Sequence, residues 1–238
     1  RDAMQDIKHF IPTEKKAEYI NALLKVGYHT IDFGSFVSPK SIPQMEDTKE
    51  LIKLLDLRDT DSKLLAIIAN ERGARDACMF EEVSYLGYPF SISETFQLRN
   101  TNSTIAESFE RVKTIQDICQ QHNKQLVVYI SMGFGNPYGD PYNKEIVEKW
   151  IQKLSKLDIK IFSLSDTVGV AQPDTIAYLF DNLVPSFPGI EFGAHLHTAP
   201  YNWKEKIDTA FEHHCRRFDT AIFGYGGCPM AKDDLIGN

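Results

Sequence analysis

Leu64-Leu65-Ala66-Ile67-Ile68-Ala69 is the stretch of sequence that decides the fold, because it is apolar at every position. A strand that is apolar on both faces is typical of a parallel sheet covered on both sides. A helix predicted over residues 48–57 precedes this strand, and a helix predicted over residues 74–86 follows it. This order of helix, strand and helix indicates a parallel α/β fold.

The same alternation extends along the rest of the chain. We expect six further strands, over residues 29–33, 90–93, 126–132, 160–164, 190–197 and 219–223. The remaining helices are expected over residues 12–26, 103–121, 143–157, 174–183 and 204–215. A TIM barrel and an open doubly wound sheet both fit this pattern. No G-x-G-x-x-G turn opens a helix, which argues against a dinucleotide-binding form of the open sheet.

A TIM barrel has eight strands, whereas the sequence predicts seven. We therefore expect a TIM (β/α)8 barrel that lacks its first strand, just before Arg1, and its closing segment, after Asn238. Barrels of this size routinely form one unit, so residues 1–238 are expected to form a single, partial catalytic domain. No repeat, low-complexity tract or linker divides the chain.

Composition excludes several classes of protein. The net charge is −7, with no basic block, which argues against a nucleic-acid-binding surface. No apolar run approaches the length that spans a membrane. No C-x-x-C pair occurs, so we expect reduced thiols and a cytoplasm-like compartment. The four cysteines are Cys78, Cys119, Cys215 and Cys228.

His195 and His197 end the strand predicted over residues 190–197. Alternate side chains of a strand point to the same face, so both imidazoles are expected to project into one space. Two neutral imidazoles aimed at one point form half of a divalent metal site. The alternative is that each histidine is an ordinary polar residue at a strand end.

Other polar residues fall at the carboxyl ends of the predicted strands, where the working residues of such barrels lie. Asp2, at the end of the strand inferred before Arg1, would add an oxygen ligand for Mg²⁺, Mn²⁺ or Zn²⁺. Asp32 and Asp166 are acid–base candidates, or else caps of the following segments. Glu94, Ser131, Thr167 and the loop over residues 224–229 belong to the same predicted rim.

Several motifs together resemble the 3-hydroxy-3-methylglutaryl-CoA lyase family, a branch of the metal-dependent lyase and synthase barrels. The R-D-A-M-Q start is similar to the family's R-D-G-L-Q segment, and S-F-V-S-P-K at residues 35–40 matches a lyase motif, as does P-Q-M at residues 43–45. S-D-T-V-G at residues 165–169 resembles G-D-T-I-G, and His195-Leu196-His197 resembles H-x-H. G-Y-G-G-C-P at residues 224–229 resembles the G-L-G-G-C-P loop of the lyase branch, and Gly237-Asn238 resembles its terminal G-N.

The resemblance implies a role for each matched residue. Its implied metal ligands are Asp2, His195, His197 and Asn238. It implies that Arg1 stabilises a thioester enolate, that Asp166 transfers a proton and that Cys228 acts from a mobile loop; Asp32 completes the catalytic candidates. Gln5, Arg1 and Thr167 are the expected substrate-binding residues. From position alone, Arg1 could instead be a solvated arginine and Cys228 a small buried apolar residue.

Three departures from the family pattern bear on these roles. Asp32 stands where the family has a glutamate, which is one methylene longer. Thr198 follows His197 where the family has H-x-H-D, which affects the support of the ligands. Residues 232–236 replace the family's small residues before the terminal asparagine.

The predicted function is retro-Claisen cleavage of 3-hydroxy-3-methylglutaryl-CoA into acetyl-CoA and acetoacetate, with Mg²⁺ or Mn²⁺, or alternatively Zn²⁺. The alternatives are a Claisen-condensing synthase of the isopropylmalate or homocitrate type, a lyase acting on another 3-hydroxyacyl thioester, and a non-catalytic barrel subunit. The expected partner is a CoA thioester, and no nucleic acid or membrane. The resemblance implies a homodimer, in the bacterial cytoplasm or, in a eukaryote, in the mitochondrial matrix.

Overall fold

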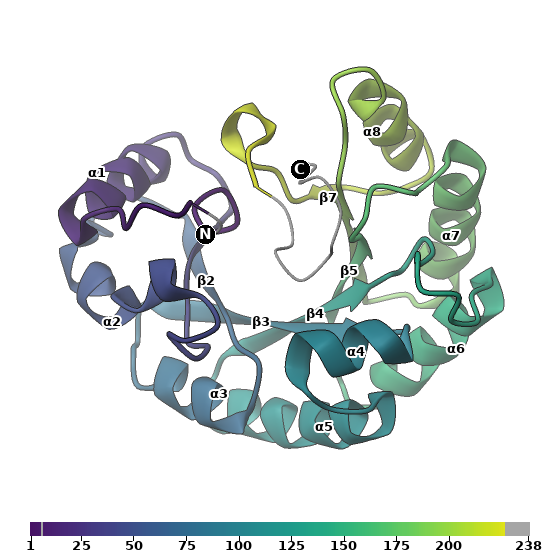
Figure 1. Ribbon diagram of the computed structural model, residues 1–238, viewed down its shortest axis with the longest axis horizontal. Coiled ribbons are helices and arrows are strands. Elements are labelled where there is room, and N and C mark those ends of the chain that lie inside the picture. The colour runs from purple at the N-terminus through teal and green to yellow at the C-terminus, as the bar shows by residue number, and fades with distance from the viewer. Residues whose placement is uncertain (6, 227–238) are drawn as a thin grey trace.

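Seven parallel strands form a curved sheet in the computed structural model, which describes residues 1–5 and 7–226. The sheet curves into an incomplete ring, and its two edge strands lie on either side of the opening (Figure 1). The strands are β1 (Thr30–Ser35), β2 (Lys63–Ile67), β3 (Val83–Ser91), β4 (Gln125–Ser131), β5 (Ile161–Asp166), β6 (Glu191–Leu196) and β7 (Arg217–Phe218).

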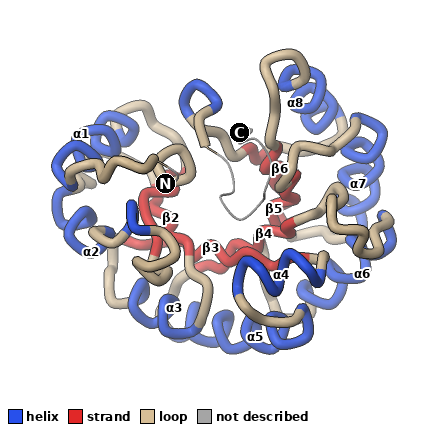
Figure 2. Tube along the Cα trace, in the orientation of Figure 1, coloured by secondary structure: helices blue, strands red, loops and turns tan. Residues whose placement is uncertain are grey.

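Helices surround the ring of strands (Figure 2). The α-helices are α1 (Thr13–Leu24), α2 (Thr48–Leu51), α3 (Glu71–Cys78), α4 (Glu94–Thr101), α5 (Ile105–Gln121), α6 (Lys144–Ser155), α7 (Pro173–Ser186) and α8 (Trp203–Glu212). Short 3₁₀ helices are η1 (Pro43–Met45), η2 (Ile52–Leu54) and η3 (Ile222–Gly224). Several helices begin at a side chain that accepts a hydrogen bond from the first turn: Asn70, Ser93, Thr104 and Asn143. Such caps replace bonds that the first turn of a helix cannot make internally.

The order of the strands distinguishes the two expected architectures. Each strand pairs in parallel with the next one along the chain, from β1 to β7. A doubly wound sheet reverses its strand order at a switch point, and this sheet does not. The barrel prediction is therefore confirmed, and in the described residues β1 and β7 are the two edges of the sheet.

The alternation of side chains along each strand creates two different surfaces. Phe162 and Leu164 of β5 face outward and belong to the large apolar cluster packed beneath the helices. Leu65, Val127 and Ile161 belong to a separate, smaller cluster on the inner face. Because the period of a strand is two residues, a shift of one position moves a side chain from the inner face to the helical layer.

The structure corrects several predicted boundaries. The helix expected over residues 74–86 ends at Cys78, and β3 begins at Val83 rather than at Phe90. The single helix expected over residues 103–121 is preceded by a separate helix, α4. The last strand, expected over residues 219–223, is β7 at Arg217–Phe218, and η3 follows it.

Two expectations from composition can be compared with the described residues. Cys78, Cys119 and Cys215 are buried free thiols, as predicted. Burial raises the pKa of both Cys119 and Cys215 to about 12, which leaves these thiols protonated and unreactive. None of the described helices combines the length and the apolar character that crossing a membrane requires.

Candidate metal centre

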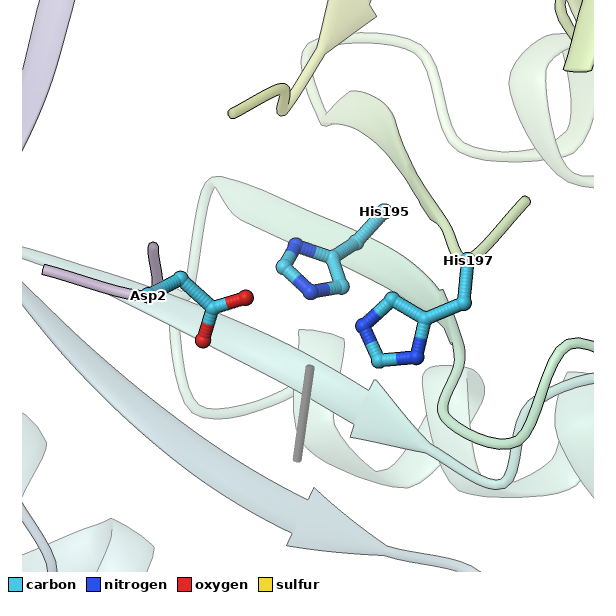
Figure 3. Close-up of side chains that lie close together, drawn as sticks. All are labelled: Asp2, His195 and His197. Atoms are coloured by element: carbon cyan, nitrogen blue, oxygen red, sulfur yellow. The ribbon is translucent and has the colours of Figure 1, made fainter. Parts of the chain in front are cut away.

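Asp2, His195 and His197 converge on one point at the carboxyl end of the sheet. Each supplies one potential ligand atom, and these three atoms all lie within 4.8 Å of one another. The Asp2 carboxylate comes from the segment before α1, and both imidazoles come from the end of β6 and the residue after it (Figure 3). The structure therefore brings together the three side chains that the H-x-H spacing and the position of Asp2 had placed at one rim, and their role as ligands stays a prediction.

His197 is held in a form that can bind a metal. Its Nδ1 lies 2.9 Å from the carbonyl oxygen of Thr167, so Nδ1 carries the proton and donates it. The other ring nitrogen, Nε2, is buried without a hydrogen-bond partner among the described residues. Burial and the neighbouring His195 lower the pKa of His197 to about 4, so the imidazole is neutral at physiological pH. A neutral imidazole with one free lone pair is the usual metal-binding form.

His195 is oriented by a carboxylate. Its Nδ1 lies 3.2 Å from Oδ2 of Asp219, which also accepts a 3.0 Å hydrogen bond from Oγ of Ser163. Burial lowers the pKa of His195, but the hydrogen bond and charge of Asp219 outweigh it and raise the pKa above its ordinary value. A carboxylate behind a ligating histidine fixes the ring and increases its basicity.

Asp219 was not among the residues predicted from the sequence. The last strand was expected to begin at residue 219, which placed this aspartate at the amino end of a strand, away from the rim. The strand ends at Phe218, so Asp219 follows it and reaches the rim. If the strand had been predicted to end at Phe218, Asp219 would have been placed at the rim.

The Asp2 carboxylate is fixed through one oxygen. Gln5 donates a 2.7 Å hydrogen bond from Nε2 to Oδ1 of Asp2, and the Arg1 guanidinium lies 3.4 Å from the same oxygen. Arg1 also donates to Oε1 of Gln5. Oδ2 of Asp2 is buried with no hydrogen-bond partner among the described residues. Gln5, predicted to bind substrate, therefore contacts the carboxylate of a candidate ligand.

Arg1 connects this carboxylate with Asp32 of β1. Nε of Arg1 lies 3.3 Å from Oδ2 of Asp32, so the aspartate reaches the arginine although it is shorter than the family's glutamate. Burial raises the pKa of the Asp32 carboxyl, and the Arg1 charge offsets part of that effect. The second oxygen of Asp32 is buried without a hydrogen-bond partner in the described structure.

The structure places Asp166 elsewhere. Asp166 ends β5 on the same face as Phe162 and Leu164, the face that meets the helices. Its Oδ2 lies 2.7 Å from Nζ of Lys206 in α8, and its Oδ1 accepts a 2.9 Å hydrogen bond from the amide of Ala171. Asp166 is 1% exposed, and both of its oxygens are engaged within the protein. Asp166 is therefore not brought into the group formed by Asp2 and the two histidines.

Two of the remaining predicted residues, Thr167 and Glu94, lie in the part of the chain that the structure describes. Thr167 supplies the carbonyl oxygen that orients His197, and its Oγ1 accepts a 2.9 Å hydrogen bond from the amide of Met132. Glu94 is the first residue of α4; it is exposed, and its carboxylate accepts a hydrogen bond from the amide of Ile105. It does not belong to the group formed by Asp2, His195 and His197. Cys228 and Asn238 lie outside the described residues.

A cavity of about 1140 Å³ adjoins the group. Its wall includes the three candidate ligands, together with Asp32 and Thr167. Oδ2 of Asp2 and Nε2 of His197, which have no hydrogen-bond partner among residues 1–5 and 7–226, are the kind of buried polar atom that proteins otherwise rarely leave unpaired. Two imidazole nitrogens and a carboxylate oxygen are a donor set that divalent cations accept, so these residues fit a metal ion.

The fold and this group define a class of protein: a parallel α/β barrel with a candidate divalent metal centre at the carboxyl ends of its strands. The chain matches the family described as HMGL-like over residues 1–229, and it belongs to that family. It is 30% identical to hydroxymethylglutaryl-CoA lyase YngG of Bacillus subtilis, over 97% of this chain and 77% of that protein.

Solved structures agree with this assignment. The chain superposes on an HMG-CoA lyase from Acinetobacter baumannii, solved with coenzyme A and 3-methylmalate, with a TM-score of 0.93 and 30% identity. That match covers 100% of this chain and 77% of the other. The HMG-CoA lyase from Brucella melitensis gives a TM-score of 0.91 and 31% identity, covering 100% of this chain and 83% of that one.

Proposed function

We propose that this protein cleaves 3-hydroxy-3-methylglutaryl-CoA into acetyl-CoA and acetoacetate, with a divalent cation held by Asp2, His195 and His197. One observation carries the proposal: the ligand atoms of these residues lie within 4.8 Å of one another, in a chain of the HMGL-like family. The relatives named as hydroxymethylglutaryl-CoA lyases support the substrate, and the relative solved with coenzyme A supports a CoA thioester.

A cation at this group would supply Lewis-acid chemistry, lowering the pKa of a bound hydroxyl and polarising a carboxylate. Mg²⁺ or Mn²⁺ is the proposed ion, with Zn²⁺ as the alternative to be tested. Asn238, which lies outside the described residues, is the proposed fourth ligand. Gln5 holds Oδ1 of Asp2 and so leaves Oδ2 as the ligand atom.

The reaction requires the tertiary hydroxyl to lose its proton, the adjacent C–C bond to break and the departing acetyl-CoA carbon to gain a proton. Asp32 is the carboxylate proposed to take the hydroxyl proton, because it lines the cavity beside Arg1 and has one unpartnered oxygen among the described residues. Arg1 is proposed to stabilise the enolate oxygen. Cys228, outside the described residues, is the proposed acid.

Asp166 takes no proton in this proposal, because both its oxygens are engaged in the helical layer. Thr167 is proposed to orient His197 through its carbonyl oxygen. The enzyme is further proposed to work as a homodimer, in the bacterial cytoplasm or, in a eukaryote, in the mitochondrial matrix. Light scattering after size-exclusion chromatography measures the oligomeric state.

The test is an assay of both products from 3-hydroxy-3-methylglutaryl-CoA, before and after metal removal. We expect equal amounts of acetyl-CoA and acetoacetate with Mg²⁺ or Mn²⁺, and no product after chelation until metal is returned. Release of CoA from acetyl-CoA and a 2-oxo acid would instead identify a condensing synthase. A metal-loaded protein that turns over neither substrate pair would contradict the proposal.

A further inference from the structure

Lys206 is a buried lysine that donates three hydrogen bonds close to the candidate metal centre. It lies in α8 and is 3% exposed. Its Nζ lies 2.7 Å from Oδ2 of Asp166, 3.0 Å from the carbonyl oxygen of Gly169 and 3.0 Å from the carbonyl oxygen of His197. An ammonium group has three donors, so all three are used.

The partners of Lys206 belong to segments that carry or orient a candidate ligand. One is the backbone of His197 itself. The other two, Asp166 and Gly169, flank Thr167, whose carbonyl oxygen accepts the Nδ1 proton of His197. Asp166 also holds the far side of this loop, because its Oδ1 accepts from the amide of Ala171 and its carbonyl oxygen accepts from the amide of Gly169.

The ring of His197 is therefore fixed at two points, its own backbone and the carbonyl oxygen of Thr167, and Lys206 bonds to the segment that carries each of them. From this geometry we infer that the Lys206–Asp166 pair is a positioning pair for the metal centre, which aims Nε2 of His197 at the ion and so raises metal affinity. The inference rests on the proposed metal site. Neither side chain is assigned a contact with the ion or the substrate.

A purely structural pair would stabilise the fold without changing the affinity of the folded protein for metal. The chain contains a matched control for that case. Lys16 of α1 is fully buried, and its Nζ lies 2.8 Å from Oδ1 of Asp47. Lys16 also donates to the carbonyl oxygen of Gln44, so it joins α1 to the segment before α2. Within the described residues, neither Asp47 nor Gln44 is a candidate ligand or forms a hydrogen bond with one.

The experiment titrates metal-free full-length protein with Mn²⁺ and measures the free ion by electron paramagnetic resonance. We expect Lys206→Met to raise the Kd for Mn²⁺ about 10-fold. Removing a residue that hydrogen-bonds to a metal ligand typically lowers metal affinity by about 10–100-fold, and Lys206 acts less directly than such a residue. The double variant Lys206→Met with Asp166→Leu leaves no buried charge unpaired, so it avoids the folding defect that the single variant risks. Its Kd should rise by a similar factor, while Lys16→Met should bind Mn²⁺ as the wild type does.

His197→Ala separates failure of this inference from failure of the proposed site. If His197→Ala binds Mn²⁺ like the wild type, the metal site is wrong and the inference falls with it. If His197→Ala loses Mn²⁺ while the folded double variant keeps the wild-type Kd within about twofold, only the positioning role is overturned. Equal losses of affinity in Lys16→Met and Lys206→Met, with both variants folded by circular dichroism, would also overturn it.

Discussion

The two buried lysine–aspartate pairs among the described residues have similar chemistry and different surroundings. In both, a helical lysine with almost no exposure bonds an aspartate and at least one backbone carbonyl. The pair of Lys16 and Asp47 joins α1 to the start of α2, and Thr13 adds a 2.8 Å hydrogen bond to the same carboxylate. The pair of Lys206 and Asp166 joins α8 to the loop after β5 and to His197.

This difference shows that a buried ion pair takes its role from the backbone it holds. Removing two charges from water costs about as much as their attraction returns, so neither pair by itself indicates high stability. Breaking either pair is costly, because one charge is left buried. Only the Lys206 pair transmits that change to a candidate metal ligand.

The largest expected effect is on stability, at the pair of Lys16 and Asp47. Lys16→Met leaves Asp47 buried without its partner, and breaking such a pair costs about 3–5 kcal/mol. Urea unfolding followed by circular dichroism measures this loss. A loss below about 1 kcal/mol would show that water reaches the site and would weaken the comparison of the two pairs.

Asp219→Asn measures what a direct partner of a ligand contributes. Asp219 holds Nδ1 of His195, so its loss should weaken Mn²⁺ binding by about 10–100-fold. Titration with Mn²⁺ gives the Kd, and the unfolding free energy shows whether the fold is kept. Asp219 contacts the ring of a candidate ligand, whereas Lys206 hydrogen-bonds, among the described residues, only to backbone carbonyls and Asp166, so Asp219→Asn should weaken binding more. A larger loss of affinity in Lys206→Met would contradict this expectation.

Gln44→Ala tests how the segment after Asp2 is held. The Gln44 side chain accepts from the amide of Ile11 and donates to the carbonyl oxygens of Ile7 and His9, all in that segment. We expect a loss of about 1–2 kcal/mol, since the freed backbone groups lie near the surface. Hydrogen exchange should accelerate at the Ile11 amide. Unchanged exchange there would contradict the hydrogen bond between the Ile11 amide and Oε1 of Gln44.

The smallest expected effect is a loss of stability at a helix cap, and it serves as a control for the measurements of metal affinity. Thr104 caps α5 and forms a capping box with Glu107, so Thr104→Ala should cost about 1 kcal/mol. Thermal unfolding measures the shift. Mn²⁺ affinity should stay at the wild-type value, and a change would mean that metal affinity follows general stability rather than the Lys206 contacts.

Much of the fold could be predicted from the sequence because apolar periodicity is local. Leu64 to Ala69 indicated a strand buried on both faces, and β2 lies there. The prediction failed at β3, where Val83 and Leu86 fit a helical spacing and Pro89 lacks the amide that a strand ladder uses. Pairing with β2 and β4 overrides those local signals.

The candidate site, like the fold, was predicted correctly where short-range spacing decides and incorrectly where a distant contact decides. The spacing of His195 and His197 determined that both rings share one face, because a strand has a period of two. In the structure β5 extends to Asp166, so the same period puts Asp166 with Leu164 on the outer face. The sequence had predicted a strand that ends at Leu164 and so suggested that Asp166 lies at the rim. Nothing local to residue 166 indicated that a lysine forty positions later would engage it.

The sequence by itself determined the alternating elements, the parallel sheet, the H-x-H pair and the family, because each depends on short-range spacing or on matched motifs. Only the tertiary structure decided that Asp219 supports His195 and that Lys206 neutralises Asp166, and it showed how closely Asp2, expected as a ligand from the sequence, approaches the two imidazoles. These contacts join residues far apart in the chain. They form because the curved sheet brings the ends of its strands to one rim and because a buried charge requires a partner.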